Sequence, residues 1–200
     1  MNWPPHFVLD LNNQNALPHD WAAQVLDATH VPERLIVRSG ADIAPGDEKF
    51  SVLEGADVRA RFDWLWRLYL GPIRAFVADR FGRPVYPANR ISSAITLNIL
   101  EGVGAETGWH TDANQVTEVF YAAMPEVGSG GELEFRHPGC PIAQIHPRAG
   151  TFICFPGSIE HRVVPLRSPK PRLAFPMVFY DSAIDQPFAS LGDRHELSVA

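Results

Sequence analysis

The sequence predicts a mainly β fold in which two antiparallel sheets face each other and N-terminal helices pack on one of them. Three observations lead to this prediction. The first 90 residues contain two stretches with apolar side chains at helical spacing. From Ile91 onward, short β-prone runs alternate with Gly and Pro. The chain of 200 residues suits one domain, with residues 1–90 as support and residues 91–180 as the sheet core.

The first expected helix extends from Pro18 to about Thr29. Its apolar residues Trp21, Val25 and Leu26 fall on one side at helical spacing.

A longer helical region is expected from Asp57 to Phe81. Gly71 and Pro72 should kink or restart it, and Gly82 suits its end. Its apolar residues at helical spacing are Val58, Phe62, Leu65 and Tyr69. The aromatic cluster of Trp64, Trp66 and Tyr69 is interpreted as packing between helix and sheet rather than as a substrate cage.

Six β-prone segments follow the helical part of the sequence. They are ISSAITLNIL (91–100), VTEVFYAAM (116–124), ELEF (132–135), TFICF (151–155), HRVVPL (161–166) and RLAFPMVFY (172–180). Many short strands separated by turn residues are typical of an antiparallel double sheet of the jelly-roll type.

The charge and the absence of long apolar runs exclude several classes of protein. The net charge is −6 and the 17 Lys and Arg residues are scattered, so no basic stripe offers a site for nucleic acid. No apolar run is long enough to cross a membrane, and the first residues do not resemble a signal peptide. We expect a cytoplasmic protein in which Cys140 and Cys154 are free thiols.

Three residues form a candidate metal site. His110 and Asp112 are two positions apart, so an extended backbone directs both side chains to one face while Thr111 points away. His161, at the head of a later β-prone run, can approach from the facing sheet. Two imidazoles and one carboxylate form the facial triad of non-haem Fe(II) oxygenases, whereas structural zinc sites fill all four positions.

The chain resembles the 2-oxoglutarate- and Fe(II)-dependent oxygenases, especially the prolyl-4-hydroxylase-like branch. The resemblance extends from about Ile91 to Tyr180 and depends on the ordered motifs GWHTD, GGELEF, EHRVV and a following Arg172. It implies a double-stranded β-helix with His110, Asp112 and His161 as iron ligands.

The resemblance also implies three residues that bind 2-oxoglutarate. Arg172 matches the residue that grips its distal carboxylate, a task suited to a planar guanidinium. Tyr121 matches a supporting tyrosine, and Asn98 is a further candidate contact. The chain departs from the family at Ala174, where Ser or Thr is frequent, and at Leu100, where Tyr is common.

The activity that the resemblance implies is oxidative decarboxylation of 2-oxoglutarate coupled to C–H hydroxylation. It would use Fe(II) and O2, with ascorbate as a candidate reductant, and the carboxylate of Asp112 favours hydroxylation over halogenation. We expect a small-molecule substrate, such as an amino acid or a natural-product intermediate, bound by segments before Ile91 and by the loop from Ala113 to Thr117. Hydroxylation of a prolyl residue in a protein is the alternative.

Two rival functions remain open from the sequence. Two histidines and a carboxylate also form catalytic zinc sites, although no HExxH helix is present. A jelly-roll binding module without catalysis is the second rival.

Other conspicuous residues are assigned outside the site. Arg162 should point away from His161 and form an outer salt bridge, and Arg167 competes with Arg172 but is expected in a loop. The alternation of side chains along a strand directs Trp109 away from the metal, but the motif turns at this point, so the sequence assigns Trp109 no role. The remaining histidines are expected at the surface; they are His6, His19, His30, His137, His146 and His195.

Overall fold

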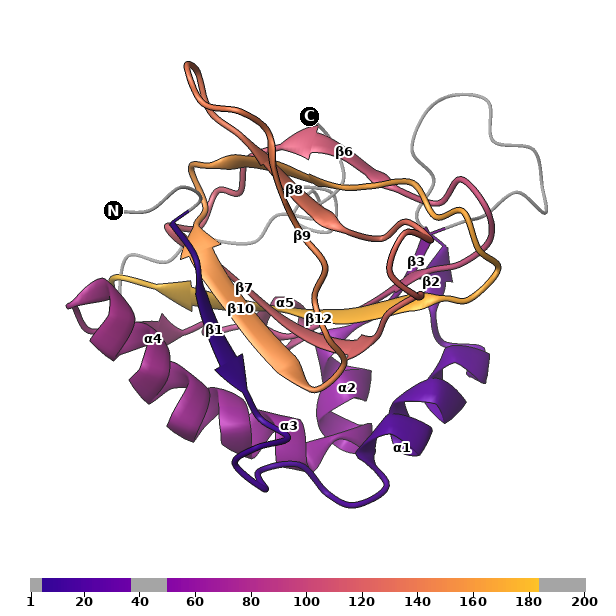
Figure 1. The fold of residues 1–200 in the computed structure, drawn as a ribbon. Coiled ribbons are helices and arrows are strands. Elements are labelled where there is room, and N and C mark those ends of the chain that lie inside the picture. The colour runs from indigo at the N-terminus through magenta and orange to yellow at the C-terminus, as the bar shows by residue number, and fades with distance from the viewer. Residues whose placement is uncertain (1–4, 37–49, 184–200) are drawn as a thin grey trace.

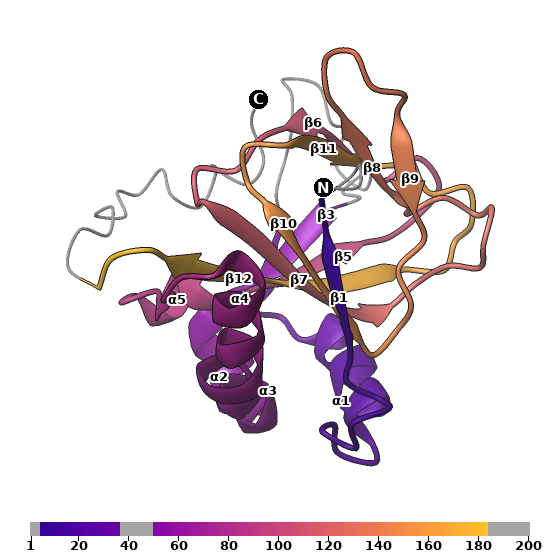
Figure 2. The ribbon, with the colours of Figure 1, turned by 60° about the vertical axis from the view of Figure 1, so that its left-hand side comes forward.

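The computed structural model describes residues 5–36 and 50–183, which form two antiparallel sheets that face each other (Figure 1). The large sheet has eight strands and the small sheet has four. The helices α1 to α4 lie on the face of the large sheet that points away from the small sheet (Figures 1 and 2). The predicted mainly β architecture, with helices bracing one sheet, is confirmed.

The strands of each sheet combine segments that are distant in the sequence. In spatial order, the large sheet contains β1 (Phe7–Asp10), β10 (Thr151–Pro156), β7 (Val116–Ala123), β12 (Arg172–Tyr180), β5 (Leu97–Leu100), β3 (Phe50–Leu53) and β2 (Leu35–Ile36), and β4 (Tyr86–Pro87) pairs with β12. The small sheet contains β6 (Thr107–His110), β11 (Glu160–Val163), β8 (Leu133–Arg136) and β9 (Ala143–Ile145). The strands of the first 90 residues were not expected, because they have only two to four residues each.

Both predicted helical regions are present, and the longer one is interrupted. The first is α1 (Trp21–Asp27) with a 3₁₀ turn (Ala28–His30). The second contains α2 (Gly55–Arg61), α3 (Asp63–Leu68), a π-helical turn (Tyr69–Ile73) and α4 (Arg74–Phe81). Pro72 lies in the π-helical turn because it has no N–H for the regular helix, and Gly82 ends α4 with a left-handed φ of 63°. None of these helices, nor any other in the described residues, could span a bilayer.

The prediction of a continuous strand over residues 91–100 is wrong in its first half. Ile91–Ala94 form one helical turn, α5, and the strand β5 begins only at Leu97. This turn packs tightly on α2, since a Cβ atom at Gly55 would lie 1.8 Å from the carbonyl oxygen of Ile91. This single turn has only four residues, too few for a helical spacing to repeat, so the sequence could not reveal it.

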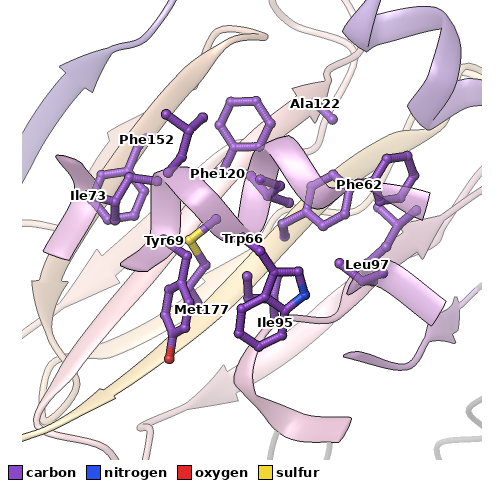
Figure 3. Packing of buried hydrophobic residues seen from close by; sticks show 14 of the residues in the cluster. Phe62, Trp66, Tyr69, Ile73, Ile95, Leu97, Phe120, Ala122, Phe152 and Met177 are labelled. Carbon is purple, nitrogen blue, oxygen red and sulfur yellow. The ribbon is translucent and has the colours of Figure 1, made fainter. Parts of the chain in front are cut away.

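Alternate residues of the central strands enter two different cores. Phe120, Phe152 and Met177 face the helices and pack with Phe62 and Trp66, as Figure 3 shows. Tyr69 stacks on Phe179, and Trp64 contacts Trp21, Phe62 and Phe120. The aromatic residues of the second helical region therefore pack on the sheet, as predicted, and form no cage.

The opposite face of the same strands lines the space between the sheets. Its buried apolar cluster consists of Tyr121, Leu133, Phe135, Ile153, Phe155, Ile159 and Ala174. A strand directs successive side chains to opposite faces. Residues two positions apart, such as Arg172 and Ala174, therefore point together into this space.

Two glycines with the same backbone conformation provide a test of this packing. Gly128 and Gly130 both have a φ of 84°, but only at Gly130 would a Cβ atom collide, at 2.1 Å from the carbonyl oxygen of Pro165. We expect Gly128→Ala to lower the free energy of unfolding by about 1–2 kcal/mol through backbone strain alone. Gly130→Ala should cost at least about 2 kcal/mol more, because overpacking adds to the strain. Equal losses in urea unfolding would contradict the contact.

Candidate metal centre

Two adjacent strands of the small sheet and one turn bring the predicted metal ligands together, so the prediction that His161 approaches from the facing sheet is wrong. His110 ends β6, and His161 lies directly opposite it in β11. Asp112 follows the end of β6, where its backbone N–H donates to the carbonyl oxygen of Gly157 at 2.9 Å. A Cβ atom at Gly157 would lie 2.0 Å from the carbonyl oxygen of Asn114. The turn that positions Asp112 therefore requires glycine at position 157.

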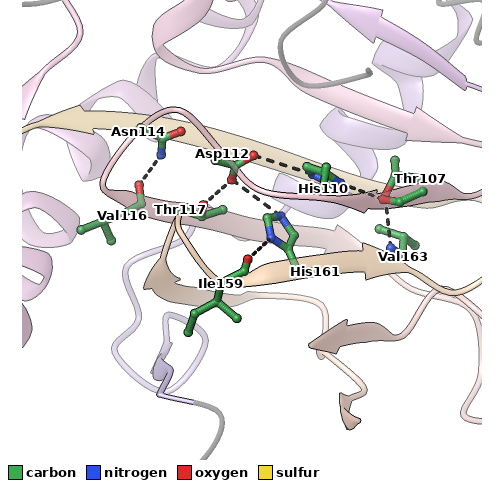
Figure 4. Close-up of polar contacts among 10 residues, drawn as sticks. Thr107, His110, Asp112, Asn114, Val116, Thr117, Ile159, His161 and Val163 are labelled. Atoms are coloured by element: carbon green, nitrogen blue, oxygen red, sulfur yellow. Dashed lines mark hydrogen bonds and ion pairs between the residues drawn. The ribbon is translucent and has the colours of Figure 1, made fainter. Parts of the chain in front are cut away.

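The distances in this cluster fit a single metal ion. The ligand atoms of His110, Asp112 and His161 lie within 4.8 Å of one another. Nε2 of His110 is 3.7 Å from Oδ1 of Asp112, and Nε2 of His161 is 3.6 Å from Oδ2 (Figure 4). Bonds from a metal to such atoms measure about 2.0–2.2 Å, so the separations of 3.7 and 3.6 Å lie within the limit of about 4.4 Å for two ligands of one ion.

The hydrogen bonds of both imidazoles leave Nε2 of each ring available to bind a metal. Nδ1 of His110 is 2.8 Å from the carbonyl oxygen of Gly108, and Nδ1 of His161 is 2.9 Å from that of Ile159. A carbonyl oxygen only accepts, so each Nδ1 carries the proton and each Nε2 presents a lone pair. Burial lowers the pKa of His161, although Asp112 opposes the shift, and this favours the neutral ring that a metal requires.

Asp112 completes a cluster of electron-pair donors. Thr117 donates a hydrogen bond to Oδ2, while the buried Oδ1 has no hydrogen-bond partner among the described residues. Two imidazole lone pairs and a carboxylate facing one point repel one another unless a cation lies between them. The residues therefore fit a divalent metal with two nitrogen ligands and one oxygen ligand.

A buried arginine without an acidic partner lies in the same space between the sheets. Arg172 is 4% exposed, its Nε donates to the carbonyl oxygen of Gly131 at 3.2 Å, and its guanidinium lies 5.1 Å from the ring centre of Tyr121. Burial lowers its pKa, and its charge helps to lower the pKa of His161. It forms no salt bridge with any described residue. A buried, unpaired cation is costly, so the position suits an anionic ligand.

The other two predicted contacts for 2-oxoglutarate lie in one row across the large sheet. Asn98 pairs with Ala174, which pairs in turn with Tyr121. The hydroxyl of Tyr121 is buried and makes no hydrogen bond of good geometry with any residue that the structure describes. Burial raises the pKa of Tyr121, and the charge of Arg172 opposes that rise. Leu100, the second departure from the family pattern, lies opposite Arg172 and fills space with apolar atoms.

Residues that were assigned outside the site mostly lie there. Arg162 forms the expected outer salt bridge with Glu134 at 2.7 Å, and Arg167 is exposed. Cys140 and Cys154 are free thiols.

The prediction that the remaining histidines lie at the surface is partly wrong. His19, His30 and His137 are exposed, but His6 is half-buried and stacks on Phe135. His146 is also half-buried, and its Nδ1 lies 3.8 Å from Oε1 of Glu132. His195 lies outside the described residues. Short flanking turns do not reveal such partial burial.

Three residues near the centre were not identified from the sequence. Thr117 holds Asp112, and Gly157 permits the turn beneath it. Glu118 is fully buried on the helix side of β7, and neither carboxyl oxygen makes a hydrogen bond of good geometry. The alternation of VTEVFY could have indicated that Glu118 lies on the opposite face from Thr117 and Tyr121.

Glu118 should make stability depend on pH. Burial raises its pKa well above the ordinary value, and the charge of Asp112 raises it further. Its contribution to stability is therefore complete below the unfolded pKa of about 4.3 and is lost as pH rises through the folded pKa. We expect Glu118→Gln to be more stable than the parent at pH 8 and to lose this advantage near pH 4. Urea unfolding across this range tests the prediction, with Glu106→Gln as the exposed control; a pH-independent difference would contradict it.

Sequence comparison finds a known family that part of the chain matches. Residues 95–180 match the sequence model of the 2OG-Fe(II) oxygenase superfamily, and this segment contains all the proposed ligands. A comparison with curated protein sequences finds no significant match.

Solved structures share the fold along most of the chain. A 2OG-Fe(II) oxygenase family oxidoreductase from Burkholderia pseudomallei has a TM-score of 0.64 at 18% identity, with 89% of this chain and 86% of that chain covered. A prolyl hydroxylase from Trichoplax adhaerens, in complex with a hypoxia inducible factor peptide, has 0.65 at 16%, with 90% and 85% covered. The epimerase SnoN, in complex with Fe3+, alpha ketoglutarate and nogalamycin RO, has 0.66 at 16%, with 88% and 79% covered. These likenesses confirm the predicted double-stranded β-helix.

Proposed function

We propose that the chain is a member of the 2OG-Fe(II) oxygenase superfamily, whose sequence model matches residues 95–180, and that it binds Fe(II) through His110, Asp112 and His161 and decarboxylates 2-oxoglutarate. One observation carries this proposal: three metal-binding groups and a buried, unpaired guanidinium occupy the same space between the sheets. The dicarboxylate 2-oxoglutarate matches both features, because one end can approach the metal while the other meets Arg172.

The residues around the centre have separate tasks in this proposal. Arg172 grips the distal carboxylate, with Tyr121 and Asn98 as supporting contacts. Thr117 fixes the carboxylate of Asp112 through its hydrogen bond. Phe155, whose ring centre lies 4.8 Å from that of His161, excludes water beside the imidazole.

The bound iron would supply the redox chemistry: O2 oxidises 2-oxoglutarate to succinate and CO2, and the second oxygen atom hydroxylates a C–H bond. The protein contributes binding, orientation and a dry cavity. Hydrolysis at a zinc site and a non-catalytic binding role are not favoured, because the family match supports neither of them.

The proposed substrate is a small molecule, with a prolyl residue of a protein as the alternative. Similar structures include proteins with each kind of partner, nogalamycin RO in one and a peptide in the other. Mass spectrometry of products from a metabolite extract and from a peptide pool distinguishes the two. A gain of one oxygen atom in peptides alone would reject the small-molecule proposal.

The activity itself is testable without the substrate. Purified protein with Fe(II), ascorbate, O2 and 2-oxoglutarate should form succinate slowly through uncoupled turnover. Succinate that stays at the level of an iron-free control would contradict the proposed function.

A further inference from the structure

Trp109 lies next to His110 but on the outer face of the small sheet. The Cζ atom of Arg136 lies 4.6 Å from the centre of its indole ring, and that of Arg162 lies 4.8 Å from it. Both distances are within the range of cation–π interactions. Trp109 thus contacts Arg162 on β11, the strand next to β6, and Arg136 on β8, the strand after that.

The two guanidinium groups are themselves held by cross-strand partners. Arg136 forms a bidentate pair with Glu160, which lies opposite it in the register. Arg162 donates to Glu134 at 2.7 Å. Such pairs of opposite charge across neighbouring strands stabilise the sheet and hold the side chains on that face in place. The ring of Trp109 therefore contacts two guanidinium groups that their glutamate partners hold in place.

A β-bulge lies where Trp109 contacts Arg162. His161 pairs with His110 and Val163 pairs with Thr107, so Gly108 and Trp109 together face a single residue of β11. A bulge adds one residue to a strand and redirects the side chains that follow it. Here the redirected side chain is His110.

The bulge also supplies the group that orients the imidazole. The carbonyl oxygen of Gly108 accepts the hydrogen bond from Nδ1 of His110 at 2.8 Å. Within the described residues, β6 is an edge strand that pairs only with β11. The few backbone pairs of β6 leave the bulge weakly held, and the contacts of Trp109 anchor it from outside.

We propose that Trp109, held by Arg136 and Arg162, is a positioning residue that fixes the bulge and thereby aims Nε2 of His110 at the metal. The inference rests on the proposed function, since it assigns Trp109 a role in the same metal site. The indole contacts the outside of the sheet, so it acts through the backbone and not through the metal or a substrate.

The test measures metal binding rather than turnover. Calorimetric titration with Mn(II) should show about 10-fold weaker binding by Trp109→Leu, within the range seen when outer partners of a metal ligand are removed. Trp109→Phe, which keeps an aromatic face, should stay within about 3-fold of the parent. Arg162→Gln should weaken binding in the same direction as Trp109→Leu. The Co(II) absorption spectrum should change in Trp109→Leu, because the imidazole would meet the metal in a different orientation.

A half-buried tryptophan on the opposite side of the molecule serves as the matched control. Trp64→Leu disturbs the packing of helix on sheet without touching β6, and thermal unfolding compares its stability with that of Trp109→Leu. The proposal is wrong if Trp109→Leu binds Mn(II) as tightly as the parent, or if Trp64→Leu weakens binding equally for the same loss of stability. Should Trp109→Leu not fold, Arg162→Gln decides, because binding of Mn(II) as tight as that of the parent would overturn the proposal. Failure of the parent protein to bind Mn(II) would instead reject the proposed function.

Discussion

The His161→Ala variant is expected to lose Mn(II) or Fe(II) binding by more than about 100-fold, and with it the formation of succinate. Even outer partners of a ligand are worth about 10–100-fold in metal affinity, so loss of a direct ligand should exceed that range. His161 lies opposite His110, and its Nε2 is 3.6 Å from Asp112. Removing the ring leaves one imidazole and one carboxylate, which is too few for the triad. Calorimetric titration with Mn(II) measures the effect directly.

An exposed histidine provides the control for this substitution. His19→Ala removes an imidazole from the surface and should leave metal binding unchanged. His161→Ala also deletes a buried contact with Phe155, so thermal unfolding of the metal-free proteins must accompany the titration. A folded His161→Ala variant that retains full metal occupancy would contradict the assignment.

Replacement of Arg172 should separate cosubstrate binding from metal binding. A charge-assisted, bidentate pair in a desolvated site is worth on the order of 2–4 kcal/mol, so Arg172→Met should bind 2-oxoglutarate roughly 30- to 1,000-fold more weakly. Mn(II) affinity should change far less, because Arg172 is not among the metal ligands. Arg172→Lys should recover only part of the loss, since lysine restores the charge without the planar fork. Anaerobic calorimetry of the Mn(II)-loaded protein measures both affinities.

The stability of the metal-free protein adds a second signature of this role. Arg172 is buried and has no acidic partner in the described part of the chain, so replacing it with methionine, which is apolar and of similar length, should leave the free energy of unfolding unchanged or raise it. Arg167→Ala is the matched control, because this arginine is exposed. Tight binding of 2-oxoglutarate by Arg172→Met together with weak binding by Arg167→Ala would show that the wrong arginine was chosen.

The fold could be predicted where periodic patterns are long. The helical region that ends at Gly82 and the strands β7, β10 and β12 extend over enough residues for their spacing to be read. The turn α5 and the strands β1 to β3 have four residues or fewer, and their positions depend on partners far along the chain. For β3, that partner is β5, which no local pattern connects with it.

The candidate metal ligands could be predicted from the sequence, but the residues that hold them in position could not. The spacing of His110 and Asp112 is local, and parity places both on one face. By contrast, the role of Gly157 depends on a close approach to Asn114, and that of Trp109 depends on two strands that lie apart in the sequence. Such contacts exist only after the strands have paired.

The fate of molecular oxygen tests the central claim most directly. Turnover of 2-oxoglutarate under ¹⁸O2 should place one ¹⁸O atom in each succinate molecule, because the oxygenase reaction transfers one atom of O2 to the new carboxylate. Succinate should be absent with His161→Ala and greatly reduced with Arg172→Met at limiting 2-oxoglutarate. Succinate without ¹⁸O, or equal labelled succinate from the parent and His161→Ala, would contradict the account.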